Sequence, residues 1–222
     1  MRHEIKSRLS PAEVPGLRAR LQAVMTRDPH ARADGTYDIH SVYLDTPSRR
    51  ALTEKQVGMP VRHKYRVRYY NDNRDFFRLE RKSKVGSLCD KVGCSLTREE
   101  AERLMAGDMD WMARDDRPLL REVFLRNRAE LLAPSVQVHY TREAYIYGPG
   151  NVRVTLDSCI RTGLWDPDFL DISQPRIRTQ GDDFVLLEVK FDAYLPEIIR
   201  DITCCHCRPM GFSKFEACHS FD

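Results

Sequence analysis

The sequence has 222 residues, of which 41% are hydrophobic and 31% charged, so the chain is long and apolar enough to bury one globular core. No repeat, low-complexity block or long Gly/Ser linker divides it, and we expect a single domain over residues 1–222. No apolar run approaches the roughly 20 residues that cross a bilayer. The N-terminus, MRHEIKSRLS, is charged from its second residue. We therefore expect a cytoplasmic protein without a membrane segment.

Charge and cysteine content exclude two further classes. Thirty-six Lys and Arg against 33 Asp and Glu leave a net charge of +3, too close to neutral to indicate nucleic acid as a partner. Seven cysteines without a secretion signal predict reduced thiols rather than a disulfide framework. The run Cys204-Cys205-His206-Cys207 is too crowded for the usual zinc-ligand spacing, and we interpret it as ordinary thiols.

Eight segments alternate apolar and polar residues with the period of two that is typical of β-strands. Gly86 predicts a hairpin between the fourth and fifth segments, and the Gly-Pro-Gly-Asn run from Gly148 predicts one between the sixth and seventh. The expected strands cover residues 2–9, 37–45, 61–71, 76–85, 87–96, 135–148, 151–161 and 184–192.

Capping residues and amphipathic spacing predict helices between the strands. Thr97 and Glu100 form a capping box, and Gly107 follows where that helix should end. The other expected helices begin at Ser10-Pro11, cover residues 118–132 and, last in the chain, begin at Pro196. Because the strands are not regularly separated by helices, the mixture predicts an α+β fold with an antiparallel sheet.

Six of the predicted strands carry charged residues at successive alternate positions, and hence on one face. In HKYRVRYYN, Lys64, Arg66 and Arg68 share a face, and Tyr65 and Val67 share the other. On one strand this pattern is explained by a sheet with one face in water. Over six strands it favours a closed sheet with a charged interior and with helices outside. Such an interior must be wet or filled by a counter-ion, and a polyanion with a divalent cation suits its Arg, Lys and Glu side chains.

Ordered motifs along nearly the whole chain carry a family resemblance. They are RHEIK, SVYLDT, RHKYRVRYY, FRLERKSK, YTREAY, VRVTLD, LLEVKF and FSKF. In this order they resemble the polyphosphate polymerase (VTC) domain of the triphosphate tunnel metalloenzyme superfamily, which also contains the CYTH-type triphosphatases. The resemblance implies an eight-stranded antiparallel β-barrel with helices packed outside. It also implies that the barrel forms a tunnel binding a nucleoside triphosphate and the growing polyphosphate.

The resemblance assigns roles residue by residue. Phosphate would be bound by the hydroxyl of Ser213 and by nine basic residues, which are Lys6, Arg66, Arg68, Lys82, Lys91, Arg142, Arg153, Lys190 and Lys214. The catalytic residues among these would be Arg66, Arg68, Lys82, Lys91, Arg142 and Lys214. Glu188 matches the family's metal-binding carboxylate, and Glu80 and Glu4 are further candidates for binding Mn²⁺ or Mg²⁺.

One position departs from the related triphosphatases, which open with E-x-E-x-K. Arg2 replaces the first carboxylate of that motif. A site with one carboxylate fewer is better suited to binding anions than to activating water. We therefore expect a metal-dependent phosphotransferase of the ATP–polyphosphate type. A triphosphatase with the same tunnel and a non-catalytic polyphosphate-binding module stay open as alternatives. The resemblance implies a stand-alone module without the regulatory domain and membrane helices of eukaryotic complexes, and leaves any membrane-protein partner open.

Overall fold

All eight predicted strands are present in the computed structural model, which describes residues 2–86, 88–163, 169–171, 173–179, 184–204 and 210–219. They are β1 (His3–Leu9), β3 (Thr36–Asp45), β4 (Val61–Tyr70), β5 (Asn73–Val85), β6 (Leu88–Leu96), β7 (Ala133–Tyr147), β8 (Val152–Thr162) and β10 (Val185–Phe191). Two short strands join them, β2 (Thr26–Arg27) on β7 and β9 (Ile177–Arg178) on β8. The α+β class with an antiparallel sheet is therefore confirmed.

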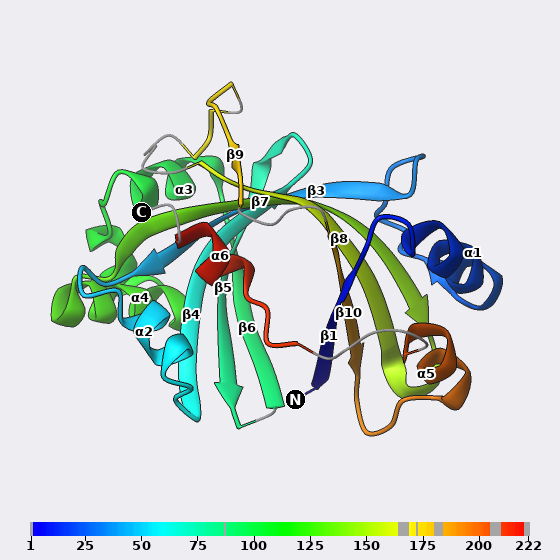
Figure 1. The fold of residues 1–222 in the computed structure, drawn as a ribbon. Helices are drawn as coiled ribbons and strands as arrows, with labels where there is room; N and C mark the ends of the chain where they lie inside the picture. The colour runs from blue at the N-terminus through cyan, green and yellow to red at the C-terminus, as the bar shows by residue number, and fades with distance from the viewer. Residues whose placement is uncertain are drawn as a thin grey trace.

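The closed eight-stranded barrel is not confirmed, because the sheet has ten strands and two ends. Its main path runs β1-β10-β8-β7-β3-β4-β5-β6, and the sheet curves strongly so that its ends approach each other (Figure 1). In the described part of the chain, one bridge joins the two ends: Arg2, which directly precedes β1, and Cys89 of β6 exchange two backbone hydrogen bonds of 3.1 and 3.3 Å. Alternation in a sequence fixes the two faces of each strand but not whether the outermost strands pair.

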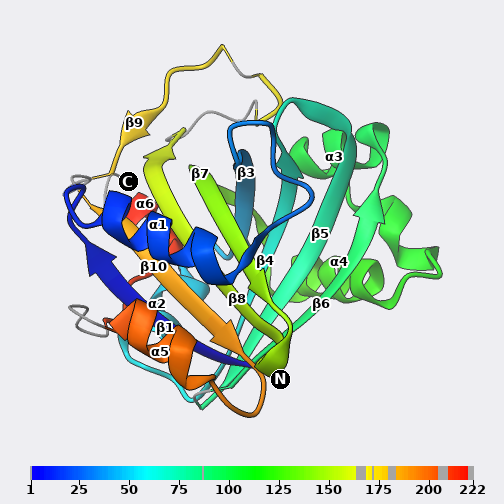
Figure 2. The ribbon, with the colours of Figure 1, turned by 90° about the vertical axis from the view of Figure 1, so that its right-hand side faces the viewer.

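The apolar strand faces point outward and are covered by helices, as predicted. Helices α3 (Arg98–Met105) and α4 (Pro118–Glu130), with the 3₁₀ helix η1 (Asp110–Arg114), pack on the β4–β6 side. Helices α1 (Val14–Val24) and α5 (Glu197–Cys204) pack on β8 and β10 (Figure 2). Helix α2 (Arg50–Gln56) lies against β3 and β4. No described helix is long and apolar enough to cross a membrane.

Local signals located the starts of three of the four predicted helices, α3, α4 and α5, whereas α2 was not predicted. The Thr97 hydroxyl accepts a hydrogen bond from the Glu100 amide at 3.2 Å, and the Glu100 carboxylate accepts one from the Thr97 amide at 2.8 Å, so the capping box is confirmed. Helix α5 begins directly after Pro196 as predicted. Helix α1 begins at Val14 rather than at Pro11, because Ser10 donates to the Glu13 carboxylate at 2.7 Å and Glu13 is the N-cap residue.

A further helix, α6 (Lys214–His219), lies on the concave side of the sheet and was not predicted; α5 is therefore not the last helix. Its Phe215 ring packs against Tyr43 of β3, with the ring centroids 5.0 Å apart. The chain that leads into α6 runs beside β1, where the Met210 amide donates to the Lys6 carbonyl at 2.8 Å (Figure 1). The short 3₁₀ helix η2 (Pro149–Asn151) forms the predicted turn between β7 and β8.

Candidate functional site

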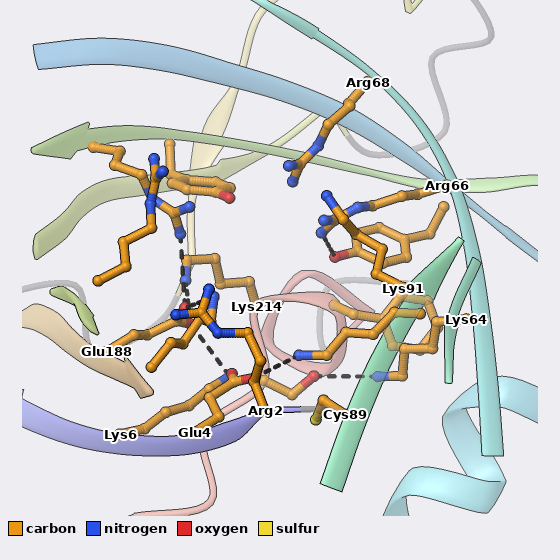
Figure 3. Close-up of a pocket in the computed structure, with 18 of the residues that line it drawn as sticks. Arg2, Glu4, Lys6, Lys64, Arg66, Arg68, Cys89, Lys91, Glu188 and Lys214 are labelled. Atoms are coloured by element: carbon orange, nitrogen blue, oxygen red, sulfur yellow. Dashed lines mark hydrogen bonds and ion pairs between the residues drawn. The ribbon is translucent and has the colours of Figure 1, made fainter. Parts of the chain in front are cut away.

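The concave face of the sheet surrounds a cavity of about 580 Å³ (Figure 3). Eleven of its lining residues are Lys or Arg and three are Glu or Asp. All predicted phosphate-binding residues line this cavity, as do the predicted metal ligands Glu4 and Glu188. These residues come from β1, β4, β5, β6, β7, β8, β10 and the start of α6, because each strand turns its charged alternate positions inward.

Strand register sets which of these charges lie opposite each other. On one wall, Lys64 of β4 lies opposite Lys82 of β5, which lies opposite Lys91 of β6. The next inward row places Arg66 opposite Glu80. On the other wall, the inward rows are Lys6 with Glu188 and Thr155, and Glu4 with Lys190 and Arg153.

Glu80 is the centre of the first group of charges, and its side chain is 1% exposed. Its carboxylate contacts Arg66 at 2.8 Å, Lys91 at 2.8 Å and, at 3.6 Å, Arg68. Burial alone would raise the pKa of Glu80, but these three cations outweigh it and hold the pKa well below its usual range. Glu80 does not line the cavity in the described structure. It lies behind the guanidinium groups and holds them in place.

Arg68 has the least satisfied guanidinium of that group. Its Nε is buried and has no hydrogen-bond partner, and the nearest carboxylate oxygen is the one at 3.6 Å. Another of its nitrogens donates to the Tyr70 hydroxyl at 3.1 Å, while Arg66 donates to the Tyr43 hydroxyl at 3.0 Å. A buried donor without a partner is costly, so this end of the cavity favours an incoming anion.

Glu188 and Asp157 are the centre of the second group. Lys190, Lys214 and Lys6 lie 3.0, 3.2 and 3.3 Å from the Glu188 carboxylate. Arg142 donates two hydrogen bonds of 2.6 and 2.7 Å to Asp157, and Lys214 contacts the same carboxylate at 2.5 Å. The surrounding cations overcome burial and hold the pKa of both carboxyl groups below the usual range.

Two cavity lysines have pKa values lowered toward neutrality. Burial, followed by the nearby cations Lys55, Lys6 and Lys82, lowers the pKa of Lys64 to about 7. Burial also lowers the pKa of Lys190 to about 8, although the Glu188 and Glu4 carboxylates oppose the change. Lysines in this range gain charge when an anion binds, since an adjacent negative charge raises their pKa.

Glu4 and Glu188 are the pair whose chemistry fits a divalent cation. Lys6 Nζ lies 3.1 Å from Glu4 and 3.3 Å from Glu188, so the two carboxylates already share one positive group. Carboxylate oxygens are the ligands that Mg²⁺ and Mn²⁺ prefer. No group of three His, Cys, Asp or Glu side chains among the described residues could hold a metal by itself. Phosphate oxygens and water would therefore have to supply the remaining ligands.

Several residues of the site were not among the predicted ones. Lys64 lines the cavity; alternation had placed it on the same strand face as Arg66, but the resemblance gave it no role. Asp157, in VRVTLD, also follows the alternation, whereas nothing in the sequence marks Tyr43. Arg2 lines the cavity too, but its guanidinium pairs with Asp192 at 3.1 Å. Residues 205–207 of the Cys204-Cys205-His206-Cys207 run lie outside the described residues.

Nearly the whole chain matches one protein family. The profile of the VTC domain matches residues 1–221. The chain belongs to the VTC domain family. The resemblance seen in the ordered motifs is thus confirmed, and this VTC domain accounts for all the strands that build the cavity. No curated protein matches the sequence significantly.

Two solved structures share the fold of this VTC domain. The PH1819 protein from Pyrococcus horikoshii OT3 is 13% identical with a TM-score of 0.50, and the similarity covers 100% of both chains. A Bacillus halodurans protein, bh2851, provisionally assigned as an adenylate cyclase, is 12% identical with a TM-score of 0.53, covering 92% of this chain and 86% of that one. The family and the basic cavity together support a tunnel-type protein that binds polyphosphate or nucleotides.

Proposed function

We propose that this VTC domain is a metal-dependent polyphosphate polymerase, which transfers the γ-phosphate of a nucleoside triphosphate such as ATP to the end of a polyphosphate chain. One observation carries the proposal: eleven Lys and Arg side chains and three carboxylates line a single cavity. So large an excess of positive charge in a confined space is stabilised by a polyanion. We place the activity in one domain and in the cytoplasm, as expected from the sequence.

The two groups of charges suit the binding of two substrates, one to each group. Arg66, Arg68 and Lys91, positioned by Glu80, would bind phosphates of one substrate. Arg142 and Lys214, positioned by Asp157, would bind those of the other, next to Lys6 and Lys190. Lys82, which pairs with Glu4 at 2.8 Å, lies between the groups. Two anionic substrates would thereby be held in line for transfer.

The reaction needs no general base. A terminal phosphate oxygen of the chain attacks the γ-phosphorus, and the bond from that phosphorus to the β–γ bridging oxygen breaks. The nucleoside diphosphate leaves with the electron pair, and the polyphosphate becomes one unit longer. Fixed guanidinium and ammonium groups stabilise the negative charge on the transferring group, which is how most of the rate enhancement in phosphoryl transfer arises.

Mg²⁺ or Mn²⁺ belongs to the proposal through Glu188 and Glu4. Both carboxylates line the cavity, whereas Glu80 does not and is the weakest of the three predicted ligands. A divalent ion bound there would neutralise phosphate charge. Lys6 now contacts both carboxylates, so the ion would compete with the Lys6 ammonium group for their oxygens.

The test is incubation of the purified chain with ATP and Mn²⁺, followed by phosphorus NMR of the products. Internal chain phosphates appearing with ADP are the expected result. Orthophosphate without chain phosphates would instead make the protein a triphosphatase. Unchanged ATP, with polyphosphate still bound, would leave a non-catalytic binding module.

A further inference from the structure

Lys64 begins a row of three lysines that crosses one wall of the cavity. The register places Lys64 opposite Lys82 and Lys82 opposite Lys91, on the inward faces of β4, β5 and β6. Like charges directly opposite each other in a sheet are destabilising. Two members of the row offset this cost with ion pairs, Lys82 with Glu4 and Lys91 with Glu80, each at 2.8 Å.

Lys64 differs from its two neighbours because it makes no ion pair with any described carboxylate. Its Nζ instead donates to the Ser213 hydroxyl at 3.3 Å and lies 4.1 Å from the centre of the Phe215 ring (Figure 3). These contacts aim the ammonium group into the cavity without neutralising it. An incoming phosphate therefore gains an ion pair with Lys64 without having to break an existing one.

Two lysines of the row lie nearer to solvent than the arginines of the same wall, and Lys64 itself is half-buried. The side chains of Lys91 and Lys82 are 52% and 36% exposed, whereas those of Arg66 and Arg68 are 15% and 5% exposed. Strand geometry separates Lys64 from Arg66 by about 7 Å along β4, and from Arg68 by about twice that distance. Lys91 shares the Glu80 carboxylate with Arg66, so a short anion held by the two arginines can reach Lys91. Such an anion leaves Lys64, one row farther out on β4, without a ligand, whereas a longer chain passes over Lys64 as well.

We propose that Lys64, beside Lys82 and Lys91, binds a phosphate group of an extended polyphosphate chain at an outer subsite, and that it is the lysine of this row with which no described carboxylate pairs. This inference rests on the proposed function, which identifies the ligand as polyphosphate. It adds Lys64 to the residues that bind phosphate, and it predicts that the contribution of Lys64 to affinity depends on the length of the chain. The charged groups with the largest effect on Lys64 are the cations Lys55 of α2, Lys6 of β1, Lys82 of β5 and Arg62 of β4, and Ser213 before α6 is its neutral hydrogen-bond partner. Lys55 is itself paired with Glu216 at 3.0 Å.

Burial and the neighbouring cations make the subsite sensitive to pH. Because burial, followed by these cations, lowers the pKa of Lys64 to about 7, this residue is charged below neutrality and loses its charge above it. A bound phosphate raises the pKa, so binding takes up a proton near neutral pH. The affinity of the wild-type protein for a long chain should fall between pH 6 and pH 8.5.

The experiment is calorimetric titration of the full chain with inorganic pyrophosphate and with long-chain polyphosphate, without nucleotide or divalent metal. We expect Lys64→Met to bind the long chain roughly tenfold more weakly, the scale of one charge-assisted hydrogen bond, and to bind pyrophosphate as the wild type does. Lys84→Met, on the same hairpin but not lining the cavity, is the charge-matched control and should bind both ligands normally. Thermal melting checks that each variant is folded.

Lys64→Arg provides the second arm, since a guanidinium keeps its charge at all these pH values. Lys64→Arg should bind the long chain as tightly as the wild type does at low pH. Its affinity should then stay constant between pH 6 and pH 8.5, where that of the wild type falls. The subsite is overturned if Lys64→Met weakens the binding of both ligands equally, or if it weakens the binding of neither. Binding of neither ligand by the wild type overturns the proposed function itself, so the two failures are distinguishable.

Discussion

Glu80 is a single carboxylate that keeps three cavity cations in place, and its removal should be costly. We expect Glu80→Gln to lower the free energy of unfolding by about 3 kcal/mol, because it leaves buried guanidinium groups without a counter-charge. Urea denaturation measures the change. Glu102→Gln breaks only the exposed pair with Arg98 and should alter stability by less than about 0.5 kcal/mol. A loss below about 1 kcal/mol for Glu80→Gln would contradict the role given to this residue.

Arg66 combines a cavity position with two fixed contacts, to Glu80 and to Tyr43. We expect Arg66→Ala to lower polyphosphate synthesis by roughly two orders of magnitude, the scale of one preorganised electrostatic contact. ADP release measures the rate, and Arg126→Ala on the outer helix α4 is the matched control. Full activity in both Arg66→Ala and Glu188→Ala would show that the cavity is not the catalytic site.

The pairing of β3 with β7 buries two histidines directly opposite each other, with their Nδ1 atoms 2.9 Å apart. Burial, followed by Arg176, lowers the pKa of His40 to about 4 and that of His139 to about 2. Below about pH 6.5 the unfolded chain protonates these groups while the folded chain does not, so stability should fall as the pH drops from 6.5 toward 4.

The histidine prediction is checked by urea denaturation at several pH values. We expect the free energy of unfolding to decrease by a few kcal/mol between pH 6.5 and pH 4. A histidine that is protonated only in the unfolded chain lowers the stability of the folded state by about 1.4 kcal/mol for every pH unit. His139→Gln should flatten this part of the curve. A variant that declines as steeply as the wild type would mean that other groups cause the loss.

At the scale of the whole molecule, the side chains that line the cavity carry an excess of positive charge, which a bound polyanion would neutralise. A ligand at one hundred times its Kd stabilises the folded state by about 2.7 kcal/mol, and about 2–4 °C of Tm accompanies each kcal/mol in a chain of this size. Long-chain polyphosphate should therefore raise the Tm by roughly 5–10 °C, with a smaller rise at high salt. Differential scanning calorimetry measures this rise in Tm. Sulfate at the same concentration of charge is the control, and equal shifts in Tm with both anions would refute specific binding.

How much the sequence could predict depended on the range of each interaction. The two-residue period of a strand is local, so the inward positions of Lys6, Arg142 and Glu188 followed from the sequence. Glu80 follows the same period, but whether it reaches the cavity depends on the arginines in front of it, which sequence does not show. Helix α6 has six residues, too short a segment for a periodic signal. The pairing of the outermost strands depends on the twist accumulated over the whole sheet.

In the part of the chain that the structure describes, one bridge, between Arg2 and Cys89, joins the two ends of the sheet. Adjacent strands elsewhere on the main path of the sheet are joined by ladders of several residues, whereas this bridge has two backbone hydrogen bonds. Among the described residues, separating the two ends of the curved sheet would therefore break fewer backbone hydrogen bonds than separating any neighbouring pair of strands on its main path. On the opposite side, β3 and β7 pair over the length of β3, so an opening there would break far more.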